Sequence, residues 1–213
     1  MLLSFDTCIP AFSVWVPYSE PKGSIGSLLS AVNITKEDIA AITTLHPKDE
    51  RIGILAAVRE ENLVTYPEIK VEAAEQLLIK VRELSDFVIV DCTSNYIFDM
   101  LTLSALEHAD WVVQLKTADP RGILYYSAQL PVLIGERYAG KKHIRVCSAV
   151  KEYQPVAEAS GDVGSFDAVL PFNEEIENKY LTGKLFEDFY TPKGKEYIKG
   201  CDTILSIMKG GEK

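Results

Sequence analysis

The stretch SDFVIVDCTS, residues 85–94, decides how the sequence is interpreted. Four apolar residues, Phe87 to Val90, lead directly into Asp91, and a small polar turn follows. A continuous apolar run of this length predicts a strand that is buried on both faces, as in a parallel sheet. An acid at the end of such a strand can orient Mg²⁺ or its bound water. The alternative is a structural Asp91 that caps the next turn or helix.

Strand-like runs of this kind alternate with segments of helical periodicity along the chain. The other predicted strands lie at residues 1–5, 52–58, 111–115, 143–150 and 167–172. The predicted helices lie at residues 67–84, 98–109, 121–138 and 194–209, the first with Pro67 at its start. The alternation predicts βαβ units and an α/β fold, a doubly wound and mostly parallel sheet with helices on both faces. We expect a single domain over residues 1–208 and a frayed tail at residues 209–213.

Composition narrows the function classes. The 213 residues are 47% hydrophobic, which suits a domain with a substantial core. A net charge of −9 argues against direct nucleic-acid binding. We expect neither a transmembrane helix nor a signal peptide, because there is no apolar run of about 18 residues and no basic N-terminal region. The 4 separated cysteines and 3 scattered histidines predict no zinc or redox motif, and they fit a reduced, cytoplasmic protein.

Residues 85–123 resemble the Walker B region of the MinD/ParA-type ATPases, in which a strand, an acid and a helix follow in the same order. Residues 1–17 look like the family's second strand, and residues 166–186 look like its late segment around a proline. The resemblance covers nearly the whole chain in order and is closest to the branch with pilus-assembly and flagellar-placement members. It implies a P-loop NTPase fold.

The resemblance also implies a nucleotide switch that binds ATP and Mg²⁺. Asp91 would orient Mg²⁺ through its bound water, and Asp6 would help to place the water that attacks ATP. Pro171 matches a proline near the adenine base, although it is equally a plain strand terminator. The family implies a homodimer or a protein partner.

The last predicted helix carries an apolar stripe made of Ile198, Cys201, Ile204, Leu205 and Met208. MinD-like proteins can use a C-terminal amphipathic helix on membranes, so the resemblance implies weak membrane association as one role for this stripe. The interpretation that we favour is a helix that docks on the sheet.

The sequence departs from the family at several functional positions. Ser4 replaces the first of two acids, and Ser148 and Ala149 stand where the family often has an asparagine that reads the adenine. The family's first strand, Walker A phosphate loop and first helix, roughly 30 residues, have no counterpart. In the family that strand is central and lies beside the Walker B strand, so its loss would leave buried backbone groups unpaired. Either the chain is a fragment of a longer reading frame, or its neighbours close the gap, or another subunit fills it.

The segment PKGSIGSLL, residues 21–29, imitates the missing phosphate loop. It aligns with KGGxGKT, but Ser27 replaces the lysine that neutralises phosphate and Leu28 replaces the threonine that binds Mg²⁺. We therefore interpret it as a turn followed by a short helix with Ser24 as its N-cap. A second helix is expected to follow, capped by Thr35 together with Asp38.

Two further segments have structural interpretations. GERYAGKK, residues 135–142, follows a predicted helix and enters a strand, which is the wrong order for a phosphate loop, so Gly140 is expected to end the helix. In KTADPRG, residues 116–122, Asp119 and Arg121 could face a ligand or a partner. The favoured alternative makes Asp119 the N-cap of the next helix.

Two function classes remain, with a third behind them. The first is an active ATPase whose phosphate loop lies upstream of Met1. The second is a degenerate or truncated relative that does not hydrolyse ATP and acts in the spatial positioning or assembly of cellular machinery. Ser4, the missing asparagine and the missing loop favour this second class, in which the chain can act without a bound cofactor. The third is an unrelated α/β enzyme with a small-molecule pocket at the strand ends.

Overall fold

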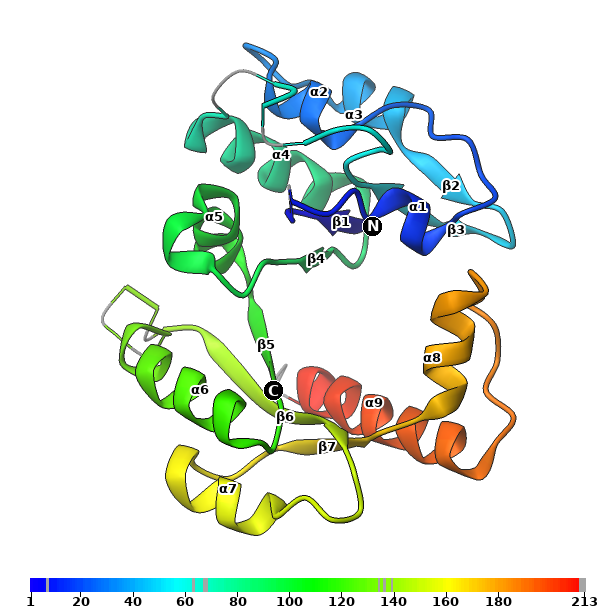
Figure 1. The fold of residues 1–213 in the computed structure, drawn as a ribbon. Helices are drawn as coiled ribbons and strands as arrows, with labels where there is room; N and C mark the ends of the chain where they lie inside the picture. The colour runs from blue at the N-terminus through cyan, green and yellow to red at the C-terminus, as the bar shows by residue number, and fades with distance from the viewer. Residues whose placement is uncertain are drawn as a thin grey trace. The chain divides into compact units, whose positions relative to one another are not determined.

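The computed structural model of the chain describes residues 1–6, 8–62, 64–66, 69–133, 135, 137–138 and 140–210 (Figure 1). Two compact units are present, an N-terminal unit, Met1–His108, and a C-terminal unit, Ala109–Lys213. Pro67, the predicted start of a helix, and residues 211–213 of the predicted tail lie outside the described residues. The prediction of one domain over residues 1–208 is not tested by this division and stays a prediction.

The N-terminal unit contains a four-stranded sheet in the order β2-β3-β1-β4. Its elements are β1 (Leu2–Ser4), α1 (Phe12–Trp15), α2 (Ile25–Leu29), α3 (Lys36–Ile42), β2 (Thr44–His46), β3 (Asp49–Leu55), α4 (Val71–Leu84), β4 (Ile89–Asp91), the 3-10 helix η1 (Tyr96–Phe98) and α5 (Met100–His108). Strand β1 pairs in parallel with both β3 and β4, whereas β2 runs antiparallel to β3. The pairing places Ser4 opposite Asp91 at the carboxyl end of the sheet.

One face of this sheet carries the main core of the N-terminal unit. Helices α2 to α5 pack there against Leu3 of β1, Leu55 of β3 and Phe5, which follows β1 directly. Helices α2, α3 and α4 lie together on one side of β1 (Figure 1). Helix α4 follows the expected spacing, because its buried residues recur every three to four positions. The opposite face is covered at β3, where Phe12 of α1 packs against Ile54.

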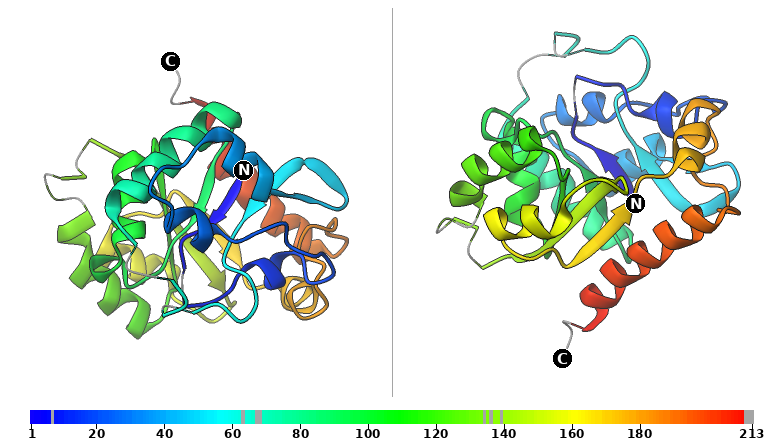
Figure 2. Two further views of the ribbon diagram at one scale, coloured as in Figure 1. Left: turned by 90° about the horizontal axis from the view of Figure 1, so that it is seen from above. Right: turned by 60° about the horizontal axis from the view of Figure 1, so that its bottom comes forward.

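The C-terminal unit contains a three-stranded parallel sheet in the order β5-β6-β7. Its elements are β5 (Trp111–Lys116), α6 (Pro120–Leu133), β6 (Lys142–Val150), α7 (Val156–Val163), β7 (Ala168–Pro171), α8 (Glu174–Leu181) and α9 (Pro192–Gly210). Helices α6 and α7 lie together (Figure 2) and pack around Cys147 of β6. Helix α9 packs against Ile144 and Val146 of the same strand, so the two helix layers use opposite faces of the sheet.

Helix α9 approaches β7 closely because Gly200 has no side chain. A Cβ at this position would lie 2.5 Å from Cδ2 of Leu170 and 2.9 Å from the carbonyl oxygen of Val169. Cys201, Ile204 and Met208 of the predicted stripe pack on the sheet. Ile198 and Leu205 are exposed instead, and the packing is completed by residues that the stripe did not include, Tyr197 and Ile207.

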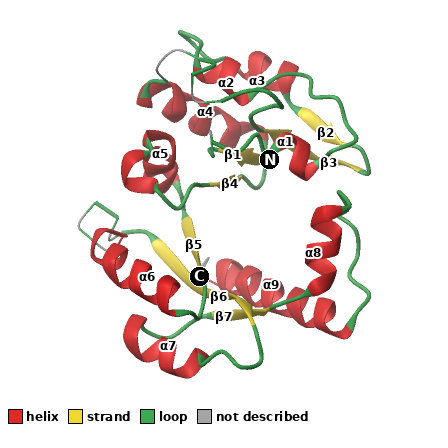
Figure 3. Ribbon diagram, viewed as in Figure 1, coloured by secondary structure: helices red, strands yellow, loops and turns green. Residues whose placement is uncertain are grey.

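The predicted α/β class is confirmed, and each of the six predicted strands is present (Figure 3). The strands form two sheets, however, and the division falls between β4 and β5. The prediction that these two strands are buried on both faces is wrong, because Phe87 and Ile89 are 74% and 64% exposed and Leu115 is 65% exposed. Each of these two strands lies at the edge of its sheet.

Local signals near the ends of helices were partly correct. Ser24 caps α2, and Thr35 and Asp38 form the predicted capping box of α3. Helix α6 ends earlier than predicted, at Leu133, so Gly140 does not end it and lies in the turn before β6. Five short elements were not predicted: α1, β2, η1, α7 and α8.

Candidate functional site

Asp6 and Asp91 lie together at the carboxyl end of the N-terminal sheet. Strands β1 and β4 are adjacent, and the backbone N–H of Phe5 donates to the carbonyl oxygen of Asp91 at 2.8 Å. The pKa of Asp91 is raised, first because partial burial disfavours its charged form and then because the charge of Asp6 is close. The two carboxylates therefore share one electrostatic environment.

The two carboxylates have different local partners. Asp6 closes its own turn, because its Oδ1 accepts hydrogen bonds from the backbone N–H groups of Cys8 at 2.9 Å and Ile9 at 3.2 Å. Within the described part of the chain, the Asp91 carboxylate has no hydrogen-bond or ion-pair partner. Asp91 is therefore not the cap that the structural alternative required, and it is the carboxylate that is more available to a ligand.

Ser4 stands where the family resemblance led us to expect another acid. Its side chain is buried, and its Oγ accepts a hydrogen bond from the backbone N–H of Asp6 at 3.3 Å. This serine supports the turn and presents no third carboxylate. Among the residues that the structure describes, no group of three or more His, Cys, Asp and Glu side chains could hold a metal ion.

Cys92 follows Asp91 directly but does not add a metal ligand. Burial raises the pKa of its thiol to about 12, with further contributions from the neighbouring acids. The thiol therefore stays protonated at neutral pH, whereas metal ligation needs the thiolate. The chemistry of this strand end is that of two carboxylates, which suit a hard divalent cation such as Mg²⁺.

The segment PKGSIGSLL cannot cradle a phosphate in this structure. The Ile25 N–H donates to the carbonyl oxygen of Ala56 at 3.2 Å, and the Gly26 N–H donates to Oγ of Ser24 at 3.1 Å. Ser24 in turn donates to the carboxylate of Glu61 at 2.5 Å. The first amides of α2 are thus already bonded, and a carboxylate occupies the position near them that an anion would need.

Glu61 holds this arrangement in place through two further bonds. Its carboxylate accepts the backbone N–H of Val58 at 2.8 Å and the hydroxyl of Tyr66. The ring of Tyr66 rests against Gly26, where an added Cβ would lie 2.3 Å from the ring. The glycine that imitated a phosphate loop is therefore needed for close packing of the 56–66 loop against α2.

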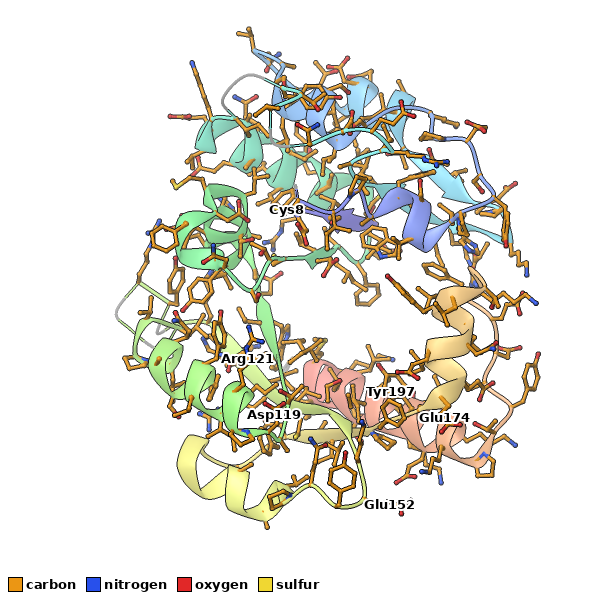
Figure 4. The ribbon with its side chains drawn as sticks, in the orientation of Figure 1. Cys8, Asp119, Arg121, Glu152, Glu174 and Tyr197 are labelled. Carbon is orange, nitrogen blue, oxygen red and sulfur yellow. The ribbon has the colours of Figure 1, made fainter. Side chains whose placement is uncertain are left out.

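Strand ends in the C-terminal unit are used differently. Asp119 and Arg121 lie where β5 leads into α6 (Figure 4), and Oδ1 of Asp119 accepts the backbone N–H of Gly122 at 2.9 Å. Hydrogen bonds from the Thr117 side chain and from this backbone hold the pKa of Asp119 below its usual value. The favoured interpretation of Asp119 as the cap of α6 is confirmed.

Pro171 ends strand β7. It lies opposite Val150 of β6, and the next backbone N–H, that of Phe172, donates to the Val150 carbonyl oxygen at 2.8 Å. The residue is half-buried. These contacts explain Pro171 as a strand terminator, and its assignment to a nucleotide base stays a prediction.

Lys116, the first residue of the segment KTADPRG, is a polar strand-end residue to which the sequence analysis assigned no role. Its side chain is 8% exposed, and its Nζ lies 2.9 Å from the centre of the Tyr126 ring with no hydrogen-bond partner within the described residues. Desolvation lowers the pKa of this ammonium to about 7. The sequence did contain a local signal for this burial. Alternate side chains of the run WVVQLK are buried, and this alternation places the lysine at its last position on the buried face.

Solved structures share this arrangement of elements. The cell division ATPase MinD of Pyrococcus furiosus aligns with 97% of this chain and 85% of its own, at 15% identity and a TM-score of 0.74. The septum site-determining protein MinD of Pyrococcus horikoshii, complexed with Mg-ADP, aligns over 85% and 72% at 16% identity and a TM-score of 0.66. The MinC:MinD cell division protein complex of Aquifex aeolicus aligns over 100% and 83% at 14% identity and a TM-score of 0.73.

The chain has the MinD/ParA P-loop NTPase fold. Comparison with protein-family models finds no match, and comparison with curated proteins finds none either. At identities of 14 to 16%, the likeness to MinD concerns the fold and not the activity.

The described residues provide only part of what a nucleotide with Mg²⁺ requires. Asp6 and Asp91 supply oxygen ligands of the type that Mg²⁺ prefers. The phosphates have no matching cradle, because the amides at the start of α2 are bonded within the protein. The described residues therefore do not make a complete MinD-type nucleotide site, and no hydrolytic step can be derived from them.

Proposed function

We propose that this chain is a MinD-like positioning protein that does not hydrolyse ATP by itself. In this role it keeps the fold and a partner surface, and it acts in the spatial positioning or assembly of cellular machinery. The pilus-assembly and flagellar-placement branch is the context that the sequence resemblance favours. The observation that carries the proposal concerns the N-terminus of α2. The hydrogen bonds that a phosphate would accept there go to the Glu61 carboxylate and to backbone carbonyl groups.

The proposed partner is a second copy or another protein. A MinD relative occurs in a MinC:MinD complex, which supports this part of the proposal. Membrane association through α9 has less support, because Cys201, Ile204 and Met208 already pack on the sheet. The described residues form no helix that is long and apolar enough to cross a membrane.

The second candidate is an active ATPase whose phosphate loop lies upstream of Met1. The observation that favours it is the Asp91 carboxylate, which is held beside Asp6 with no partner in the described residues. A purely structural acid would normally be paired or capping. In this second case ATP and Mg²⁺ are the cofactors, as the Mg-ADP complex of a MinD relative supports.

Calorimetry with ATP and Mg²⁺, together with phosphate release, separates the two candidates. The proposal predicts no micromolar binding and no phosphate release above the buffer. The matched variants are Asp91→Ala and Asp86→Ala, since Asp86 is an exposed acid just before the same strand. Micromolar binding that disappears in Asp91→Ala and persists in Asp86→Ala would contradict the proposal and favour the active ATPase.

A further inference from the structure

The C-terminal sheet has one apolar face and one polar face. Helix α9 covers the apolar face, where Ile144 and Val146 of β6 are fully buried. The opposite face, which we call the α6 face, is covered by α6 and α7, and Cys147 of β6 points to it. Parallel strands normally carry apolar residues on both faces when helices cover both. The residues of β5 and β6 that share the α6 face are Val112, Gln114, Lys116, His143, Arg145 and Cys147.

The uncharged polar groups on the α6 face satisfy one another. The amide nitrogen of Gln114 donates to Nδ1 of His143 at 2.8 Å, because an amide nitrogen can only donate. The hydroxyl of Tyr126, from α6, donates to Oε1 of Gln114 at 2.9 Å. Gln114 and Tyr126 are both buried. This series of bonds therefore fixes the Tyr126 ring against the sheet.

The two cations on the α6 face are not satisfied in this way. Nζ of Lys116 lies 2.9 Å from the centre of the Tyr126 ring and 5.5 Å from that of Phe166, and it is buried without a hydrogen bond to a described residue. The guanidinium of Arg145 likewise forms no hydrogen bond or ion pair with the described part of the chain. A buried charge is costly unless it is paired, so both cations have capacity for an anion.

The two cations act on each other. The pKa of Lys116 is lowered first by desolvation and then by the positive charge of Arg145, which lies two residues away from the register partner of Lys116. Gly164 lies against the Arg145 side chain, since an added Cβ would be 2.5 Å from Nη1. Arg145 and Phe166 are half-buried and Asp167 is exposed, so this end of the cluster is in contact with solvent.

The charges of the cluster indicate which anion fits. Among the described residues, the acid that acts on Lys116 is Asp167, and its carboxylate bonds to the backbone N–H of Arg145. Burial raises the pKa of the Cys147 thiol, which therefore stays neutral. Two cations and one carboxylate leave one positive charge, which a monoanion neutralises and a dianion exceeds. The planar fork of the guanidinium matches a carboxylate better than a spherical ion such as chloride.

We propose that Lys116 and Arg145 bind one small monocarboxylate on the α6 face, with the rings of Tyr126 and Phe166 beside it. Lys116 keeps its packing on the Tyr126 ring, and the anion supplies the hydrogen-bond acceptor that its ammonium lacks. The site lies within the C-terminal unit and uses neither Asp6 nor Asp91. It therefore stands or fails separately from the proposal on ATP hydrolysis.

An NMR titration of the full chain, labelled with ¹³C at lysine Cε, tests the site with acetate as the probe. An anion that binds the ammonium more tightly than the neutral amine raises the pKa of that lysine. We expect about 100 mM sodium acetate to raise the pKa of Lys116 by at least about one pH unit relative to sodium chloride at the same ionic strength. Lys151, which is exposed, is the internal control and should titrate identically in both salts.

Two arginine variants give the matched comparison. Arg145→Gln should remove the acetate-dependent rise, whereas Arg121→Gln, the same change at an exposed arginine at the start of α6, should retain it. Arg145→Gln also removes a like charge, so each variant is compared with itself in acetate and in chloride. If Arg145→Gln does not fold, Arg145→Lys keeps the charge without the fork and should weaken acetate binding by about tenfold.

Three results would overturn the proposal. The first is a pKa of Lys116 in the wild type that is the same in acetate and in chloride. The second is an equal rise of that pKa when either salt is added to a low-salt sample, because the site would then respond to charge alone. The third is an acetate-dependent rise that persists in Arg145→Gln, which would exclude the guanidinium from the site.

Discussion

The carboxyl ends of the strands differ between the two units. In the N-terminal unit, Asp91 ends β4 with a carboxylate that has no partner among the described residues, beside a second acid. In the C-terminal unit, Asp119 caps α6, and Lys116 is buried against the Tyr126 ring. A polar residue at a strand end is therefore weak evidence for a site until its partners are known. The N-terminal strand ends have a carboxylate available to a ligand, whereas the polar residues at the C-terminal strand ends take part in capping and packing.

The largest effect that would sharpen this comparison concerns Lys116, whose pKa is lowered to about 7 by desolvation. The unfolded chain, with a lysine pKa near 10.5, binds more protons between about pH 7 and 10.5, so stability should rise with pH across that window. The slope can reach about 1.4 kcal/mol per pH unit. Lys116→Met should remove this slope and be most stabilising below pH 7.

The measurement is urea denaturation of the wild type and the variant between pH 6 and pH 10, taken as a difference at each pH. Lys151→Met is the matched control, because Lys151 also lies over an aromatic ring, 4.9 Å from the centre of Phe172, but is exposed. The control should show a flat difference. A flat difference for Lys116→Met as well would mean that this lysine is charged and satisfied, and the C-terminal strand ends would no longer be distinct.

The second effect concerns the face of the C-terminal sheet on which α9 packs. Gly200→Val places a Cβ against Leu170 and the Val169 carbonyl oxygen, so α9 must move away from β7. We expect a loss of about 2 kcal/mol in the free energy of unfolding. Gly210→Ala in the same helix, where no atom lies within 4 Å of the added Cβ, should be nearly neutral in the same urea titration. Equal effects of the two substitutions would contradict close packing at Gly200.

The smallest effect concerns the acid pair. The raised pKa of Asp91 means that the folded chain binds more protons than the unfolded chain above the usual Asp pKa of 3.8, so stability falls as pH rises through that window. Asp6→Asn should lower the pKa of Asp91 towards its usual value, as measured by NMR titration of its carboxyl carbon. The gain in stability at neutral pH should stay below about 0.5 kcal/mol, because solvent screens the carboxylate, which is only partly buried.

Asp202→Asn, on α9, is the control for that titration and should leave the Asp91 pKa unchanged. If Asp6→Asn also leaves it unchanged, the two carboxylates do not interact, and burial alone explains the shift. The N-terminal strand ends would then offer isolated acids and not a pair.

The sequence predicted the features that depend on local patterns. The run into Asp91 gave the strand and its acid, helical spacing gave α4, and Ser24 and Thr35 were identified as caps. These features follow from periodicity and from side-chain bonds to amides two or three residues away. Five short elements were not predicted, because three to eight residues carry little periodic signal.

Other features depend on contacts between distant segments. Glu61 reaches Ser24 across 37 positions, and no local pattern shows that its carboxylate would occupy the start of α2. The exposure of Ile89 could not be predicted from an apolar run, because burial of the second face depends on which elements cover it. Lys116 is similar, since its missing partner is a property of the packed C-terminal unit.

Paramagnetic line broadening by Mn²⁺, used in place of Mg²⁺, tests the difference between the two units most directly. The account predicts broadening of the Asp6 and Asp91 amides that Asp91→Ala removes, with the Asp119 and Phe172 amides unaffected at the same Mn²⁺ concentration. Broadening centred on Asp119 or Phe172, or equal broadening at both sets of strand ends, would contradict it.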